Sequence, residues 1–90
     1  MEKQELHDRL ERLHAELRQI DSVDPEEREM LAHLAGDIRA LLDRPEAERR
    51  RGYAQLGDRL RAAVGRLEAS YPRTTILMGQ VIDTLAGIGL

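Results

Sequence analysis

Large apolar residues recur at helical spacing along most of this chain, and this pattern predicts an all-α fold. Between residues 2 and 20 the intervals between them are four, three, four and three residues, the a/d pattern of a coiled-coil seam. The seam covers an arc of only about 80° of the helix surface. It consists of Leu6, Leu10, Leu13, Leu17 and Ile20. The first predicted helix therefore presents a thin buried stripe.

A second helix is predicted from Pro25 to about Leu42, because Asp24 is a good N-cap and proline fits the first helical position. Glu27 completes a capping-box pattern with Asp24. The apolar arc of this helix is wider than that of the first, at about 140°. Since the connection between the two helices is short, residues 1–43 are predicted to form an antiparallel hairpin.

Pro45 marks the break between the two halves of the chain, because the residue before a proline avoids the helical region. A third helix follows with an apolar stripe from Tyr53 to Tyr71, and Pro72 is expected to end it. Three glycines in this segment each weaken a helix by up to about 1 kcal/mol relative to Ala, or permit close contact with a neighbouring helix. These glycines are Gly52, Gly57 and Gly65.

The last predicted helix runs from about residue 73 or 74 to Gly87 and is two-sided. Its apolar arc spans about 140°, with Leu77, Val81, Leu85 and Ile88 along the middle. The opposite side is polar and nearly uncharged, and consists of Gln80, Asp83, Thr84 and Gly87. Residues 46–90 are thus predicted to form a second hairpin, and the chain 1–90 a single helical domain.

The unequal widths of the apolar stripes predict self-association. A thin seam on the first helix cannot cover the wide faces of the second and fourth, and burying each further Leu or Ile is worth roughly 1.5–3 kcal/mol. We therefore expect a dimer or higher oligomer with coiled-coil-like packing. The candidate interface consists of Leu6, Leu10, Leu13, Leu17, Ile20, Leu77, Val81, Leu85 and Ile88.

Composition narrows the location and the chemistry. The chain has no cysteine, which excludes a disulfide framework and a thiol nucleophile and agrees with a reducing compartment. Its beginning is acidic and amphipathic, so no signal peptide is expected. No stretch approaches the roughly 18–20 apolar residues that span a bilayer. We predict a cytoplasmic protein.

The first helix also carries a stripe of potential metal ligands, His7, Glu11 and His14. Imidazole and carboxylate are ordinary zinc ligands, but the spacing differs from the HExxH motif and no fourth ligand is evident. Polar residues at these positions are typical of the flanks of a coiled coil, which is the favoured interpretation. Because the serines and threonines lie mostly at helix ends, where capping explains them, we predict no metal, no cofactor and no enzymatic activity.

Charge is distributed unevenly between the two halves of the chain. Residues 1–43 hold twelve acidic and six basic residues, whereas residues 44–90 hold five and eight. Arg49, Arg50 and Arg51 form the strongest basic cluster. It is a candidate anion contact for nucleic acid, but Glu46 and Glu48 lie close enough in sequence to pair with it, so this alternative is less favoured.

A resemblance to a known family is carried by two segments, ELHDRLERLHAEL near the start and RLEASYPRTTILMGQVIDTLAGIGL at the end. These resemble the DUF4404 family of small bacterial proteins, a domain of unknown function. In that family the step into the last helix reads as an acidic residue, a spacer and then His-Pro. Glu68, Tyr71 and Pro72 match this frame with Tyr in place of His, which favours a structural role for the junction. The resemblance implies a helical fold and no known activity.

These observations together predict a non-catalytic protein that acts through self-association or through contact with another helical protein. The first alternative is a regulator that touches nucleic acid through Arg49–Arg51. The second is peripheral attachment to a membrane surface through the last helix, which its nearly neutral polar face makes weaker.

Overall fold

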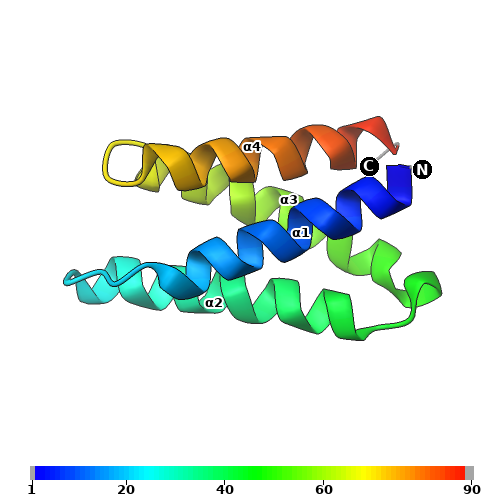
Figure 1. The fold of residues 1–90 in the computed structure, drawn as a ribbon, viewed down its shortest axis with the longest axis horizontal. Helices are drawn as coiled ribbons and strands as arrows, with labels where there is room; N and C mark the ends of the chain where they lie inside the picture. Colours follow the sequence, from blue (N-terminus) through cyan, green and yellow to red (C-terminus); the bar gives the residue numbers. More distant parts are fainter. Residues whose placement is uncertain (1, 89–90) are drawn as a thin grey trace.

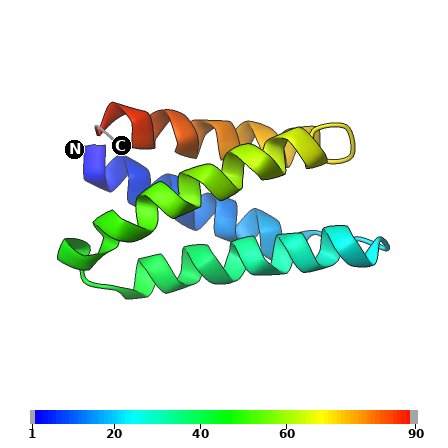
Figure 2. The same ribbon diagram turned by 180° about the vertical axis from the view of Figure 1, so that it is seen from behind.

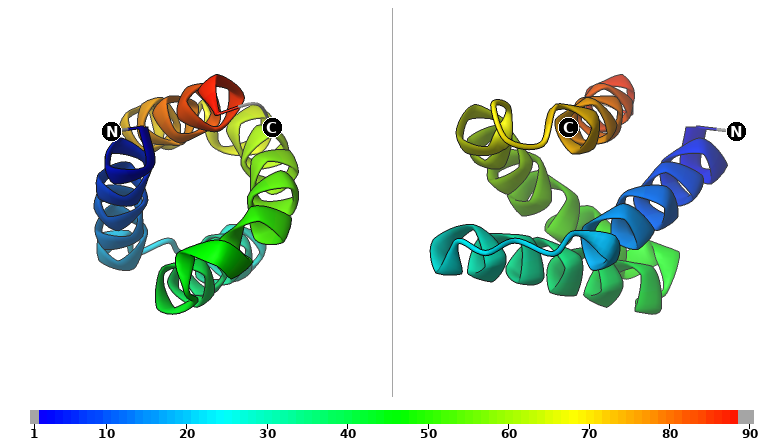
Figure 3. Two further views of the ribbon diagram at one scale, coloured as in Figure 1. Left: turned by 90° about the vertical axis from the view of Figure 1, so that its right-hand side faces the viewer. Right: turned by 60° about the vertical axis from the view of Figure 1, so that its left-hand side comes forward.

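Four α-helices make up the computed structural model, which describes the backbone of residues 2–88 and the side chains of residues 4–88. The helices are α1 (Glu2–Gln19), α2 (Pro25–Asp43), α3 (Glu46–Leu67) and α4 (Pro72–Gly87). They run alternately up and down (Figure 1), and seen end-on they form a ring in chain order (Figure 3). Each helix contacts both of its neighbours in the ring, and the contact of α4 with α1 closes it. The predicted all-α fold of four helices is confirmed. Residues 1, 89 and 90 of the predicted hairpins lie outside the described residues.

The start of α2 follows the sequence prediction in part. Asp24 is the N-cap, and its Oδ1 accepts hydrogen bonds from the backbone N–H groups of Glu26 and Glu27, at 2.9 and 3.5 Å. The reciprocal half of the expected capping box is replaced, because the backbone N–H of Asp24 donates to Ser22 Oγ at 3.2 Å. Ser22 is buried and thereby fixes the entry of the chain into α2.

The junction between α3 and α4 lies earlier than the position of proline suggested. Helix α3 ends at Leu67, whose carbonyl accepts from the N–H groups of Ser70 at 3.1 Å and Tyr71 at 2.8 Å. Pro72 does not end α3 but is the first residue of α4, where a missing N–H costs no intrahelical hydrogen bond. The bonds to the Leu67 carbonyl therefore form the turn, and proline starts the next helix.

The core is almost entirely aliphatic and receives side chains from all four helices. Leucine dominates it, and the most completely buried positions include Leu10 on α1, Ile38 on α2, Leu60 on α3 and Val81 on α4. The radius of gyration of the Cα atoms is 12.4 Å, close to the ~12 Å of a compact domain of this length. Because α1 is covered by both α2 and α4, its thin stripe and their wide faces close on one another within one chain.

The buried face of α4 is rotated relative to the predicted one. Thr84, expected on the polar side, is buried, whereas Leu77 and Ile88 are only partly buried. Arg9 on α1 pairs with the polar groups of this face, since its Nη1 donates to Thr84 Oγ1 at 2.7 Å and to the Gln80 carbonyl at 3.0 Å. This guanidinium satisfies the polar groups that α4 turns towards α1, so a threonine can lie inside the bundle.

Glycine has different roles at two positions of α3, which makes a matched pair of predictions. A Cβ added at Gly52 would overlap the side chain of Leu41, whereas at Gly65 it would meet no atom within 4 Å. We expect Gly65→Ala to raise the free energy of unfolding by up to about 1 kcal/mol, through helix propensity alone. Gly52→Ala should lower it, because the buried Leu41 must move. Urea unfolding followed by circular dichroism measures both, and equal stabilisation by the two alanines would contradict close packing at Gly52.

Candidate functional site

The nine apolar residues predicted to form an interface between chains lie mostly inside one chain. Six of them are buried in the core, namely Leu6, Leu10, Leu13, Leu17, Val81 and Leu85. The other three, Ile20, Leu77 and Ile88, pack against that core and are partly buried. The structure thus removes the premise of the prediction, which was that these stripes lack cover within the chain. In the folded single chain, the six buried side chains are not exposed to a partner.

The candidate metal ligands on α1 do not converge. His7 Nε2 lies 2.6 Å from Glu11 Oε1, an i,i+4 pair on the surface. His14, one turn further along, lines the groove between α1 and α2 instead. Throughout the part of the chain that the structure describes, no three His, Asp or Glu side chains are placed to hold a metal ion.

The arginine cluster predicted to contact anions is divided between two roles. Arg49 folds back over the end of α2, where its Nε donates to the carbonyl of Arg44 and its Nη2 to the carbonyl of Leu42, both at 3.0 Å. It therefore satisfies carbonyls that the helix leaves without intrahelical partners. Arg50 and Arg51 are exposed and line a surface hollow together with Arg44.

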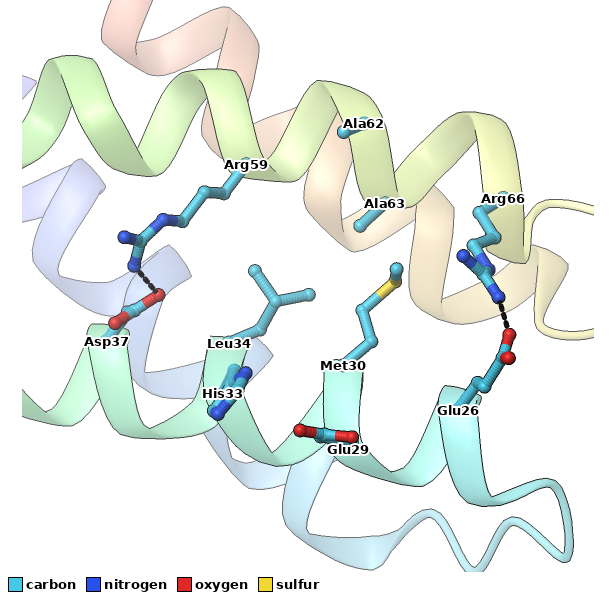
Figure 4. A pocket seen from close by; sticks show the side chains of 10 residues that line it. All are labelled: Glu26, Glu29, Met30, His33, Leu34, Asp37, Arg59, Ala62, Ala63 and Arg66. Atoms are coloured by element: carbon cyan, nitrogen blue, oxygen red, sulfur yellow. Dashed lines mark hydrogen bonds and ion pairs between the residues drawn. The ribbon is translucent and has the colours of Figure 1, made fainter.

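A groove of about 740 Å³ lies between α2 and α3. The two helices separate from their short connection towards their other ends (Figure 2). The groove lies between them. Its residues are Glu26, Glu29, Met30, His33, Leu34, Asp37, Arg59, Ala62, Ala63 and Arg66. Met30, Leu34 and Ala63 point into its middle and form an apolar floor (Figure 4).

The two walls of this groove carry opposite charge. Its acidic groups all come from α2, and its arginines all come from α3. Two ion pairs cross between the walls, Asp37 with Arg59 near one end and Glu26 with Arg66 near the other (Figure 4). All four of these side chains are partly exposed to solvent. The apolar floor lies between the two ion pairs. With three carboxylates and two arginines in its lining, the groove has a small excess of negative charge and is polarised across its width.

A second groove, between α1 and α2, differs in charge. Its charged lining consists of Arg18, Arg28 and Arg39 with no carboxylate, in the half of the chain that is otherwise acidic. Arg28 is already engaged, since its Nε and Nη2 donate to the carbonyl of Ser22 at 3.1 and 2.9 Å. Arg39 pairs with Asp43 at 3.3 Å. Two of the three arginines thus serve the local structure.

Sequence reasoning missed the groove between α2 and α3 because its walls come from distant segments. Glu26 and Arg66 are 40 residues apart, and Asp37 and Arg59 are 22 residues apart. The available signal was weak: acidic residues at helical spacing along α2 and arginines at helical spacing along α3. Only the packing of α2 against α3 shows that the two rows face each other.

Of the comparisons with known proteins, only the one with protein families finds a match. A search of curated proteins and a search of solved structures find no match. Among the described residues, no helix has the length and apolar character to cross a membrane. The DUF4404 family model, described as a domain of unknown function, matches residues 6–90, which include all of α2, α3 and α4 and most of α1. The chain therefore belongs to the DUF4404 family.

Proposed function

We propose that this chain is a non-catalytic interaction protein that binds a second copy of itself through the groove between α2 and α3. The observation that supports this proposal is the polarised groove, with an acidic wall, a basic wall and an apolar floor between them. A surface that carries acidic and basic residues in separate rows is complementary to itself, because each row can face the opposite row of an identical partner.

The apolar floor supplies a reason to associate. Met30 is only partly buried in the single chain, and Ala62 is exposed beside it. A second copy would cover both, and complete burial of a methionine side chain is worth roughly 1.5–3 kcal/mol relative to exposure. The charged rows would act mainly on register and on partner choice, because exposed ion pairs each contribute little to affinity.

Ala62→Glu tests the use of this groove. The side chain of Ala62 is exposed, so the fold should tolerate Glu there, whereas a dimer through this groove would bury the new carboxylate at the interface. We expect wild type to sediment at twice the 10.2 kDa monomer mass and Ala62→Glu to weaken the dimer by roughly thirtyfold or more, on the order of 2 kcal/mol.

Ile76→Glu is the matched control, because Ile76 is 63% exposed and does not line the groove. It should leave the dimer intact, and circular dichroism should show both variants as helical as wild type. A wild type that remains monomeric at every concentration, or equal weakening by the two variants, would contradict the proposal.

Anion binding is a second candidate function, favoured by the hollow that Arg44, Arg50 and Arg51 share. We expect replacement of these three arginines by Gln to abolish a low-salt gel shift with duplex DNA, while Arg49→Gln leaves it largely unchanged. Wild-type binding should weaken steeply as salt rises, because phosphate contacts release counterions. Absence of a shift at low salt would exclude this function.

Peripheral membrane attachment through α4 is less favoured than these two functions. Val81 and Leu85 lie along the middle of the predicted apolar face of this helix, and both are buried inside the bundle. Ile76 is the one large apolar residue of α4 that is mostly exposed within the described region. A single exposed isoleucine gives far less apolar area than an interfacial helix requires.

A further inference from the structure

The charge pattern of the groove also determines how two copies would be oriented. We infer that the dimer has a twofold axis running along the groove, so that α2 of each copy lies over α3 of the other. This inference rests on the proposed self-association and adds its geometry. It follows from the four charged residues that form the two ion pairs and from the positions of the apolar residues between them.

Rotation about an axis along the groove exchanges the walls and keeps the ends in place. The acidic wall of one copy then faces the basic wall of the other. At one end, Glu26 lies over Arg66 of the second copy, because Glu26 and Arg66 already mark the same end within one chain. At the other end, Asp37 lies over Arg59 of the second copy for the same reason. Each arginine thus faces two carboxylates and each carboxylate two arginines.

Rotation about an axis across the groove gives the opposite result. It exchanges the ends and keeps each wall over itself, so that Glu26 of one copy faces Asp37 of the other, and Arg59 faces Arg66. Juxtaposed like charges at an interface cost several kcal/mol and exclude such an arrangement. Of the two ways to place the groove on a copy of itself, only the axis along the groove brings unlike charges together.

The axis along the groove also repeats the packing that the chain already uses. Within one chain α2 and α3 are antiparallel neighbours. Under this rotation α2 of one copy is antiparallel to α3 of the other, so the four helices enclose a common centre. That centre would hold Met30 and Ala62 from both copies, because these two groove residues keep exposed surface in the single chain whereas Leu34 and Ala63 are already buried.

Cysteine cross-linking distinguishes the two orientations, and the chain provides a clean background because it contains no cysteine. His33 is exposed on α2 between the two acidic ends, and Ala62 is exposed on α3 between the two arginines. The axis along the groove places His33 of one copy over Ala62 of the other. The axis across the groove instead places α2 over α2, which brings the two copies of His33 towards each other. A disulfide requires the two Cα atoms to lie within about 7 Å of each other.

The experiment uses single variants, so that every disulfide joins two chains. Full-length His33→Cys and Ala62→Cys proteins are oxidised separately and as an equal mixture, and the products are separated on a non-reducing gel and weighed by mass spectrometry. We expect the mixed dimer to be the main product of the mixture. Each variant alone should give no more dimer than Ile76→Cys, which lies outside the groove and measures random collisions.

The outcomes separate this geometry from the proposed function. A His33→Cys homodimer as the main product would overturn the axis along the groove in favour of the axis across it. Background cross-linking in every sample, with a dimeric wild type in sedimentation, would overturn the geometry and leave self-association standing. A monomeric wild type would overturn both.

Discussion

Leu85→Asp is expected to unfold this domain. Leu85 is 2% exposed and belongs to the same core as Leu10 and Leu60. The side chains around it are aliphatic. Within the described chain, every buried side-chain nitrogen or oxygen already has a hydrogen-bond partner, so none is left to pair with a carboxylate here. Burying an unpaired charge costs several kcal/mol, which is comparable with the roughly 5–13 kcal/mol expected for a chain of this length. Circular dichroism at 25 °C should show the loss of most helical signal.

Ile76→Asp is the control on the same helix. Because Ile76 is 63% exposed, the added carboxylate stays in water, and the free energy of unfolding should change by no more than about 0.5 kcal/mol. This pair also tests the position of the face of α4. A folded Leu85→Asp protein that had merely lost self-association would show that α4 turns Leu85 outward, contrary to the structure.

Leu10→Ala should destabilise the bundle by about 2–5 kcal/mol. Leu10 has no exposed surface, and α1 is held between α2 and α4, so the neighbouring side chains can close the cavity only in part. Urea unfolding should show a lower midpoint with an unchanged slope, because the native fold and the surface exposed on unfolding remain the same.

Val23→Ala provides the comparison for Leu10→Ala. Val23 is 93% exposed in the connection between α1 and α2, so its truncation removes no packing and should leave the midpoint nearly unchanged. Equal effects of the two substitutions would mean that the seam of α1 is not buried within the chain. Leu10 would then be available to a partner, as the sequence alone suggested.

The helices themselves were predictable because each depends on local information. Apolar spacing located all four, and Asp24 and Pro45 marked two of the boundaries. Errors arose where a local signal has two meanings. Pro72 can follow a helix or start one, and here it starts α4 while hydrogen bonds to the Leu67 carbonyl complete the turn. The extent of an element was thus easier to predict than the structure of the junctions.

The candidate site could not be predicted from the sequence, because it depends on which helices pack against each other. Thr84 counts as polar on a helical wheel, which does not show that its hydroxyl is paired with Arg9 and with the Gln80 carbonyl inside the bundle. Similarly, nothing in the sequence distinguishes Arg49 from Arg50. In the structure, Arg49 donates hydrogen bonds to carbonyls at the end of α2, whereas Arg50 lines the surface hollow. The widths of the apolar stripes indicated how much of each helix surface is buried. They did not indicate that the four stripes would pack against one another within a single chain.

Closure of the core changes where an interaction surface should be sought. Because the leucine seam of α1 is buried in the core, the surface that remains for a partner is mainly charged rather than apolar. Specificity on such a surface comes from the arrangement of charge more than from apolar area. This favours the polarised groove between α2 and α3, whose two rows of charge complement each other, over the predicted leucine interface.

Charge reversal of one wall at a time tests self-association through this groove most directly. Glu26→Arg with Asp37→Arg makes both walls basic, and Arg59→Glu with Arg66→Glu makes both walls acidic. Each double variant should sediment as a monomer because like charges would face each other. An equal mixture of the two should sediment as a heterodimer of twice the 10.2 kDa monomer mass. If both variants and their mixture show the same mass as one another, the groove is not where two copies of this chain meet.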